Sequence, residues 1–228
     1  MSDDLLDNPA FAALQHAHAG LGRASELAAV YDPLVSPLAG LSEATPEALL
    51  DLAGLVPSGA GVGVLSTQPR LPESAGWRLL RVMPLHQMVC ETPPGQPEPF
   101  DELTPSDAPE MVALAELTEP GPFLQRTIEM GRYVGVRSGG RLVAMAGERM
   151  KLPGCTEVSG VCTHPDARGR GLALRMVLNV LAECFARGDR AFLHVVAGSP
   201  SETTAIGIYE RLGFEHRRPI YAHVLLRE

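Results

Sequence analysis

The most chemically suggestive stretch of the sequence is a glycine-rich run that follows a short apolar segment. It reads Val-Cys-Thr-His-Pro-Asp-Ala-Arg-Gly-Arg-Gly-Leu-Ala over residues 161–173. The pattern predicts a strand, a tight turn and a helix that begins near Leu172. The first turn of a helix has about four free N–H groups and a partial positive charge, and Gly169 and Gly171 leave room for close approach. With Arg168 and Arg170 as cationic donors, the loop predicts a site for a pyrophosphate or similar anion.

The spacing of the glycines excludes two common phosphate-binding motifs. No Gly-x-x-x-x-Gly-Lys-Ser/Thr sequence is present, and Gly-x-Gly-x-x-Gly is not completed because Leu174 stands at the last position. The run of Gly59, Gly61 and Gly63 also fails that spacing and precedes a strand instead of following one. What remains at 168–173 is Arg-x-x-Gly-x-Ala.

A second pattern lies further along the chain. Residues 205–214 read Ala-Ile-Gly-Ile-Tyr-Glu-Arg-Leu-Gly-Phe, which predicts a helix that ends at Gly213 and a last strand that begins at Phe214. Together the two patterns resemble the GNAT superfamily of CoA-dependent N-acyltransferases. Their pyrophosphate loop reads Gln/Arg-x-x-Gly-x-Gly/Ala, and a later helix reads Ala-x-x-x-Tyr-x-x-x-Gly-Phe. The loop is most similar to the C-terminal domain of glycine N-acyltransferases, and the resemblance covers about residues 99–228.

The resemblance implies a role for each motif. The loop would hold the pyrophosphate of acetyl-CoA, and the strand before it would run beside the pantetheine arm. Strands 157–163 and 191–196 would splay apart to admit the thioester. Tyr209 would protonate the departing thiolate while a primary amine attacks directly, so positioning supplies most of the rate. The residues implied in cofactor binding are Val161, Cys162, Thr163, Arg168, Gly169, Arg170, Gly171, Leu172 and Ala173.

A base must also remove a proton from the acceptor ammonium. Glu157 is the first candidate, since some family members carry a base glutamate at this spacing before the glycines; Glu148 and water are the alternatives. Glu202 stands where the family often has an asparagine that contacts the cofactor, and an ionised carboxylate cannot donate a hydrogen bond.

Several other residue types could suggest chemistry but favour simpler interpretations. Cys162 is expected to be a small buried hydrophobe, because no histidine is evidently paired with it. His194 is expected to be a core histidine. His16 and His18 are one residue apart on a predicted helix and do not share a face, and the cysteines form no Cys-x-x-Cys pair, so no metal site is predicted.

The order of elements around these motifs predicts an α/β fold with a mixed, mostly antiparallel sheet and helices on both faces. The predicted strands of the second part are 133–137, 141–146, 157–163, 191–196 and a last one from Phe214. The predicted helices are 105–130 with a break near Pro120, 172–187 and 205–212.

A proline-rich tract at 92–99 predicts a boundary between an N-terminal α/β segment (1–98) and a GNAT-like domain (99–228). The first segment has a predicted helix from Pro46 and predicted strands at 61–66, 77–82 and 85–90. Residues 1–60 carry eight acids and one base. We expect this segment to form one wall of the acceptor site and to favour a cationic amine.

The composition limits the partners and the compartment. A net charge of −8 argues against nucleic acid. No apolar run approaches the roughly 18–20 residues of a spanning helix, and the acidic start differs from a signal peptide, so a cytoplasmic, membrane-free protein is expected. The predicted function is acetyl transfer from acetyl-CoA to a small-molecule or peptide amine, without a metal. A CoA-binding sensor of the same fold is the alternative, and homodimer formation through exposed strands stays open.

Overall fold

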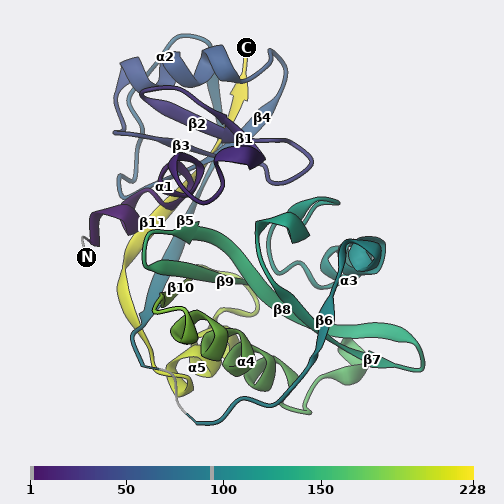
Figure 1. Cartoon of the computed structure of the whole chain (residues 1–228). Helices are drawn as coiled ribbons and strands as arrows, with labels where there is room; N and C mark the ends of the chain where they lie inside the picture. Colours follow the sequence, from purple (N-terminus) through teal and green to yellow (C-terminus); the bar gives the residue numbers. More distant parts are fainter. Residues whose placement is uncertain (1–2, 93–94) are drawn as a thin grey trace.

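One large β-sheet organises the protein, as a computed structural model that describes residues 3–92 and 95–228 shows (Figure 1). Across these ranges eleven strands lie in the order β1-β2-β3-β4-β11-β5-β10-β9-β8-β7-β6. The strands are β1 (Gly22–Ala24), β2 (Ala28–Tyr31), β3 (Leu38–Leu41), β4 (Gly61–Ser66), β5 (Trp77–Cys90), β6 (Asp101–Leu103), β7 (Tyr133–Ser138), β8 (Arg141–Leu152), β9 (Cys155–Thr163), β10 (Arg190–Val196) and β11 (Phe214–Arg227). The helices are α1 (Pro9–Gln15), α2 (Pro46–Leu55), α3 (Ala108–Thr118), α4 (Leu172–Ala186) and α5 (Glu202–Arg211).

The sheet is mixed, as the sequence predicts. In the described ranges β3–β4 and β9–β10 are the parallel pairs, and the other neighbours are antiparallel. The helices of the second part begin and end close to their predicted positions, and short 3₁₀ turns occur at Asp3–Asp7, Ala19–Leu21, Pro105–Asp107, Thr127–Met130 and Pro165–Ala167. The predicted α/β architecture is therefore confirmed.

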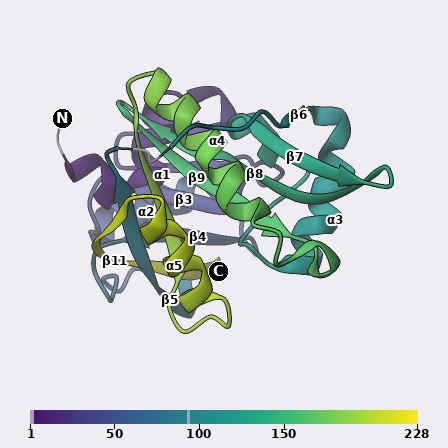
Figure 2. The same cartoon turned by 90° about the horizontal axis from the view of Figure 1, so that it is seen from below.

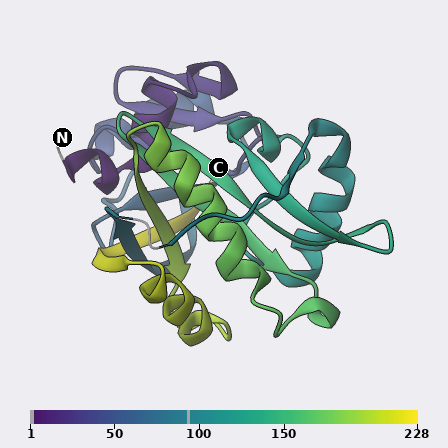
Figure 3. The ribbon, with the colours of Figure 1, turned by 60° about the horizontal axis from the view of Figure 1, so that its bottom comes forward.

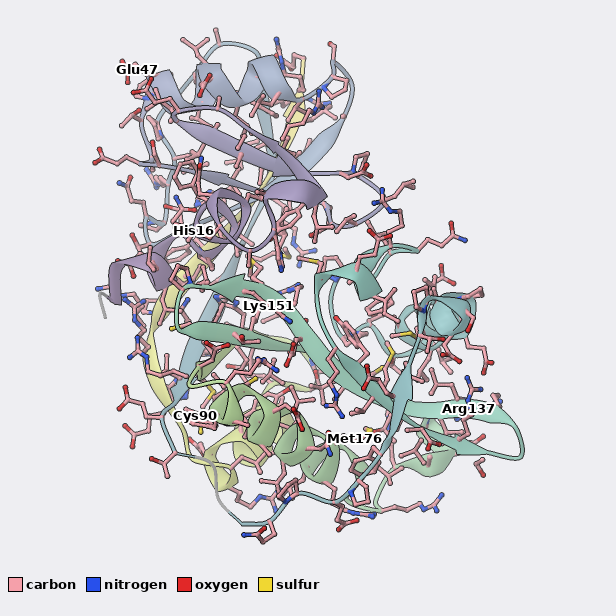
Figure 4. The ribbon with its side chains drawn as sticks, viewed as in Figure 1. His16, Glu47, Cys90, Arg137, Lys151 and Met176 are labelled. Carbon is pink, nitrogen blue, oxygen red and sulfur yellow. The ribbon has the colours of Figure 1, made fainter. Side chains whose placement is uncertain are left out.

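Helix α4 covers one face of the sheet, and Figures 2 and 3 show it lying across the central strands. Its buried side includes Met176 (labelled in Figure 4) and Val180, which pack with Ala144, Ala146 and Val158 from the strands beneath. On its outer side, the amide of Asn179 donates to the carbonyl of Glu98. The chain that enters β6 thus crosses over α4 (Figure 3).

The opposite face of the sheet is covered by two different parts of the chain. Helix α3 packs there with Met145, Tyr133 and Cys162. Helix α1 and β2 pack beside it, in a cluster that also contains Phe192 of β10 and Met150 of β8. The N-terminal segment therefore shares a hydrophobic core with the strands that carry the predicted site.

Strand β5 occupies an interior position that the sequence does not reveal. Two strands were predicted, at 77–82 and 85–90, but the structure has one continuous strand that pairs with β11 along its length and with β10 over Leu85–Cys90. Pro84 is tolerated because β10 ends beside it: the Pro84 carbonyl accepts from the Ala197 N–H just beyond β10. The missing N–H of Pro84 thus faces the end of a neighbour instead of its middle.

Strands β9 and β10 separate soon after they meet. Their parallel pairing joins Cys155 to Arg190, Thr156 to Ala191 and Glu157 to Phe192, and no further pair follows among the described residues. A bulge at Gly160 (φ +62°) marks the divergence, because Gly160 and Val161 together oppose Ala146 alone. The β10-facing edge of β9 is therefore unpaired from Val158 to Thr163, as the splayed strands of the resemblance imply.

The N-terminal part differs most from expectation. The helix predicted from Pro46, which Thr45 caps, and the strand Gly61–Ser66 are confirmed. The helix predicted around His16 and His18 ends before them, at Gln15, and strands β1 to β3 were not predicted. Part of the proline-rich boundary, residues 93–94, lies outside the described residues. The strand before it, β5, lies between two strands that follow it, so the two predicted segments contribute to one sheet.

Candidate active site

The glycine-rich loop presents a row of unpaired backbone donors. Gly169 and Gly171 adopt left-handed φ values of +74° and +69°, and an added Cβ at either would meet open space. In the described part of the chain, none of the N–H groups from Gly169 to Leu174 donates to a protein acceptor; the first helical bond is from Arg175 to Gly171. The chemistry of this donor set fits a bound phosphate oxygen, and the exposed Arg168 and Arg170 flank it.

The unpaired edge of β9 leads from the diverging strands to this loop. Val161, Cys162 and Thr163 lie along that edge, where free backbone groups can pair with an extended ligand as a neighbouring strand would. The Thr163 carbonyl already accepts a hydrogen bond from Arg168 Nε at 3.3 Å. The Cys162 side chain is buried, and burial raises the pKa of its thiol to about 11. This thiol stays protonated at neutral pH, in agreement with its predicted role as a small hydrophobe.

Tyr209 lies on α5, whose N-terminus follows the end of β10. Its ring packs edge-on against Phe214, with 5.7 Å between ring centroids. Burial, with a smaller contribution from the Cys162 thiol, raises the pKa of the phenol to about 12. The phenol therefore keeps its proton at physiological pH.

Glu157 is held in a fully buried ionic network. Arg149 binds its carboxylate through two hydrogen bonds of 2.7 Å, His194 Nδ1 donates at 2.8 Å, and the Met150 N–H is 3.4 Å away. Burial would raise the pKa, but the charge and hydrogen bonds of Arg149, followed by those of His194, lower it to about 2. All four acceptor positions are occupied, so this carboxylate is a weak proton acceptor in this arrangement.

His194 is satisfied on both sides of its ring, as predicted for a core histidine. Its Nδ1 faces Glu157, and its Nε2 lies 3.1 Å from the side-chain amide nitrogen of Gln87. The amide orientation is fixed, since the Gln87 nitrogen also donates to the Leu6 carbonyl and its oxygen accepts from Arg217. The network thus reaches from β9 through β10 and β5 to the N-terminal segment.

The other carboxylates of the analysis have separate surroundings. Glu148 is buried and bonds to Lys151 at 2.8 Å and to Arg187, the residue directly after α4, at 2.6 Å; together these contacts lower its pKa despite burial. Glu202 accepts from the Gly198 N–H and lies 2.7 Å from His86, and these contacts lower its pKa. Glu148 therefore stabilises the junction of α4 with β8, and Glu202 closes the turn between β10 and α5.

The sequence analysis missed two groups of this site, Arg149 and Tyr133. Arg149 is the counter-ion of Glu157, and its charge also acts on Tyr133. Gly147 and Gly160 could have indicated that a large side chain lies over the sheet, because glycines inside strands often mark the close approach of another group. In the structure this group is the ring of Tyr133. Nothing in the sequence indicated which group approaches.

We also searched the described residues for other pockets, for groups of metal-ligating side chains and for membrane-spanning helices. One pocket, of about 950 Å³, is lined by α2, the loop at 69–75 and the start of β5, and contains none of the predicted site residues. In the described ranges, no three His, Cys, Asp or Glu side chains are close enough together to hold a metal ion. No helix among those residues is both long and apolar enough to cross a bilayer.

Comparison with known proteins identifies the class to which this fold and loop belong. Residues 133–222 match the family model of FR47-like proteins. A solved structure from Novosphingobium aromaticivorans, described as an acetyltransferase from the GNAT family, is 41% identical, covers 98% of both chains and has a TM-score of 0.88. The chain therefore belongs to the GNAT family and has the fold of an acetyltransferase.

More distant structures share the fold alone. A GCN5-related N-acetyltransferase from Kribbella flavida is 17% identical over 95% of this chain and 93% of its own, with a TM-score of 0.60. A GNAT-family acetyltransferase from Colwellia psychrerythraea is 13% identical over 89% and 84%, with a TM-score of 0.55. Among curated protein sequences, no significant match was found.

Proposed function

We propose that this protein transfers an acetyl group from acetyl-CoA to a primary amine. The observation that carries the proposal is the row of unpaired N–H groups at the start of α4, continuous with the unpaired edge of β9. These two features offer a phosphate cradle and a strand partner in the order that CoA presents its pyrophosphate and pantetheine. The 41% identity to a structure described as a GNAT-family acetyltransferase supports the same assignment.

In this proposal each site residue has a defined task. Backbone donors from Gly169 to Ala173 hold the pyrophosphate, with Arg168 and Arg170 beside it, and the edge from Val161 to Thr163 orients the arm. Bound acetyl-CoA supplies the activated acyl group as a thioester. Tyr209, whose phenol is neutral, gives its proton to the thiolate, whose own proton affinity rises in the same desolvated site.

The proton of the acceptor ammonium needs a separate route. Glu157 was the predicted base, but its lone pairs are occupied and its pKa is lowered to about 2. We propose that the amine loses this proton to water before it attacks, and that Glu157 fixes Arg149 and His194 behind the diverging strands. The pH dependence of the acetyl-transfer rate distinguishes the two routes. A rate that follows the fraction of neutral amine supports loss of the proton to water. A fall in rate at acidic pH that disappears in Glu157→Gln supports Glu157 as the base instead.

We further propose that residues 1–98 form one wall of the acceptor site. Their loop at 32–36 contacts the segment before β7, where the Thr127 hydroxyl donates to the Val35 carbonyl at 2.6 Å. The acidic charge of this segment favours a cationic acceptor, and exposed charges are screened by salt. The KM of a diamine should therefore rise more steeply with ionic strength than that of a neutral amine, and equal slopes would contradict the idea.

The deciding experiment measures thiol release from acetyl-CoA with a panel of polyamines, amino acids and peptides. Amine-dependent release supports acyl transfer. The occupied lone pairs of Glu157 also favour the second candidate, a CoA-binding sensor, because the predicted base is a weak proton acceptor. Stabilisation by acetyl-CoA without thiol release would support the sensor, and the absence of both effects would refute both functions.

A further inference from the structure

Tyr133, the first residue of β7, has a buried hydroxyl without a partner. Its side chain is 1% exposed, and its Oη makes no hydrogen bond within the described part of the chain. Most buried hydroxyls in proteins are paired, because the loss of hydration is otherwise uncompensated. The other buried tyrosine of this region, Tyr31, follows that rule with a 2.9 Å contact between its hydroxyl and His18 Nδ1. The orphan at Tyr133 therefore requires an explanation.

The ring of Tyr133 crosses the sheet toward the diverging strands. A Cβ at Gly147 of β8 would lie 2.3 Å from ring atom Cδ1, and a Cβ at Gly160 of β9 would lie 2.9 Å from Cε1. The ring thus starts over β8 and extends over β9, with its far end at the bulge. Two glycines inside strands leave room for this path, and any larger residue would block it.

The surroundings of the hydroxyl indicate where it points. The ring atom that carries the hydroxyl, Cζ, would lie 3.7 Å from a Cβ at Gly160, in the bulge of β9 that follows its last pair with β10. The charges of Arg149, Glu157, Cys162 and Glu148 also act on the titration of this hydroxyl. Glu157 offers no free lone pair, since Arg149, His194 and Met150 occupy them. The hydroxyl is thus a donor beside the gap, with no acceptor supplied by its neighbours.

We propose that the Tyr133 hydroxyl donates a hydrogen bond to the acyl oxygen of a thioester held between β9 and β10. The inference rests on the proposed acetyl transfer and names a residue that contacts the acyl group. As the C–N bond forms and the C–S bond breaks, electron density rises on that oxygen, where a fixed donor stabilises it. The departing thiolate takes the proton of Tyr209. The resulting phenolate recovers a proton from the acceptor nitrogen, which carries an extra one after the C–N bond has formed, and Tyr133 keeps its proton throughout.

Two features suit Tyr133 to this role. Burial raises the pKa of its phenol well above the ordinary value, so the group remains a neutral donor at working pH. Its ring is fixed between Phe123, at 5.4 Å between centroids, and the glycine floor of the sheet. A donor that is already desolvated and oriented needs no reorganisation when charge develops.

The test is Tyr133→Phe in the full-length protein, with three measurements. The Tm of the ligand-free variant should equal or exceed that of the wild type, because the lost hydroxyl has no partner; Tyr31→Phe, which removes a partnered hydroxyl, should lower it. The preference for binding acetyl-CoA over CoA, measured by calorimetry without an amine, should fall several-fold. The kcat for acetyl transfer should fall on the order of 10²-fold.

Each outcome bears on the inference. A variant that retains both its acetyl-CoA preference and its kcat overturns it, as does one that loses Tm and binds CoA and acetyl-CoA equally poorly, since that pattern indicates a packing role. A loss of preference in a protein that releases no thiol with any amine would leave the acyl contact standing while acetyl transfer fails. A wild-type protein that does not bind acetyl-CoA overturns the proposed function and this inference together.

Discussion

Acidification should weaken the attachment of the N-terminal segment to the catalytic sheet, because it protonates a buried histidine. His18 Nε2 donates to the Met130 carbonyl at 3.1 Å, and its Nδ1 accepts from the Tyr31 hydroxyl at 2.9 Å, so both contacts suit a neutral ring. Burial is the largest cause that lowers its pKa from 6.5 to about 4, and the Met130 carbonyl only partly opposes it. His18 therefore joins the segment to the start of β7 in its unprotonated form.

The sign and size of the effect follow from these values. In the unfolded chain His18 takes up its proton near pH 6.5, whereas the native protein takes it up only near pH 4. The unfolded state binds more protons between these values, so the free energy of unfolding falls as the pH drops through this window. From about pH 7 to about pH 4.5 the loss amounts to about 2 kcal/mol, which lowers the Tm of a chain of this length by roughly 4–8 °C.

The assay is thermal unfolding over this range for wild type, His18→Gln and His16→Gln. His18→Gln should be less stable at neutral pH but should lose less Tm on acidification, whereas the exposed His16 (Figure 4) serves as the matched control and should leave the slope unchanged. All variants should still lose some Tm on acidification, because burial also lowers the pKa of His223. Identical slopes in wild type and His18→Gln would refute the reasoning. Measurements stop near pH 4.5, below which Glu157 contributes its own loss.

Three further substitutions examine the site. Gly171→Asp places a carboxylate against the bound phosphate and should abolish the stabilisation by acetyl-CoA, which is about 2.7 kcal/mol at a hundredfold excess over Kd and is measured as a rise in Tm; Gly59→Asp, with a similar φ of +82° and open space, is the control and should retain this rise. Tyr209→Phe should lower kcat on the order of 10²–10⁴-fold with little change in CoA affinity, and unaltered turnover would return the ring to a packing role. Glu157→Gln leaves a buried guanidinium without its counter-charge and should cost about 3–5 kcal/mol in chemical unfolding; a loss below 1 kcal/mol would show that the network is not stabilising.

Local patterns were sufficient for the elements around the loop. The glycines at 169 and 171, the apolar run of α4 and the closing Gly188 each act over a few residues, so the strand, turn and helix could be predicted with their bounds. The tyrosine helix and the start of β11 at Phe214 have equally local signals. The divergence of β9 and β10 was expected only from the family resemblance, because no pattern within those strands predicts it.

Long-range placement could not be predicted in the same way. Pro84 indicated a break in β5, and only the end of β10 beside it explains why the strand continues. Glu157 was readable as a strand-end carboxylate, but its partners come from positions 149 and 194, so its low pKa depends on the folded sheet. The short strands β2 and β3 are buried throughout and lack the alternation that marks a half-buried strand.

The interior position of β5 determines when the sheet can be completed during synthesis. Cys90 ends β5, and Arg190 begins its neighbour β10 one hundred residues later. At ribosomal rates of about 5–20 residues per second, β5 waits roughly 5–20 s for that neighbour, and β11 follows later still. Until then both its edges are open, and it carries Leu79 and Leu80, which remain half exposed even in the finished fold. During this interval the nascent chain exposes an apolar strand with unpaired edges, which can pair with other chains. The sheet is completed late and through contacts between residues far apart in the sequence, so we expect the protein to refold slowly and to benefit from chaperones.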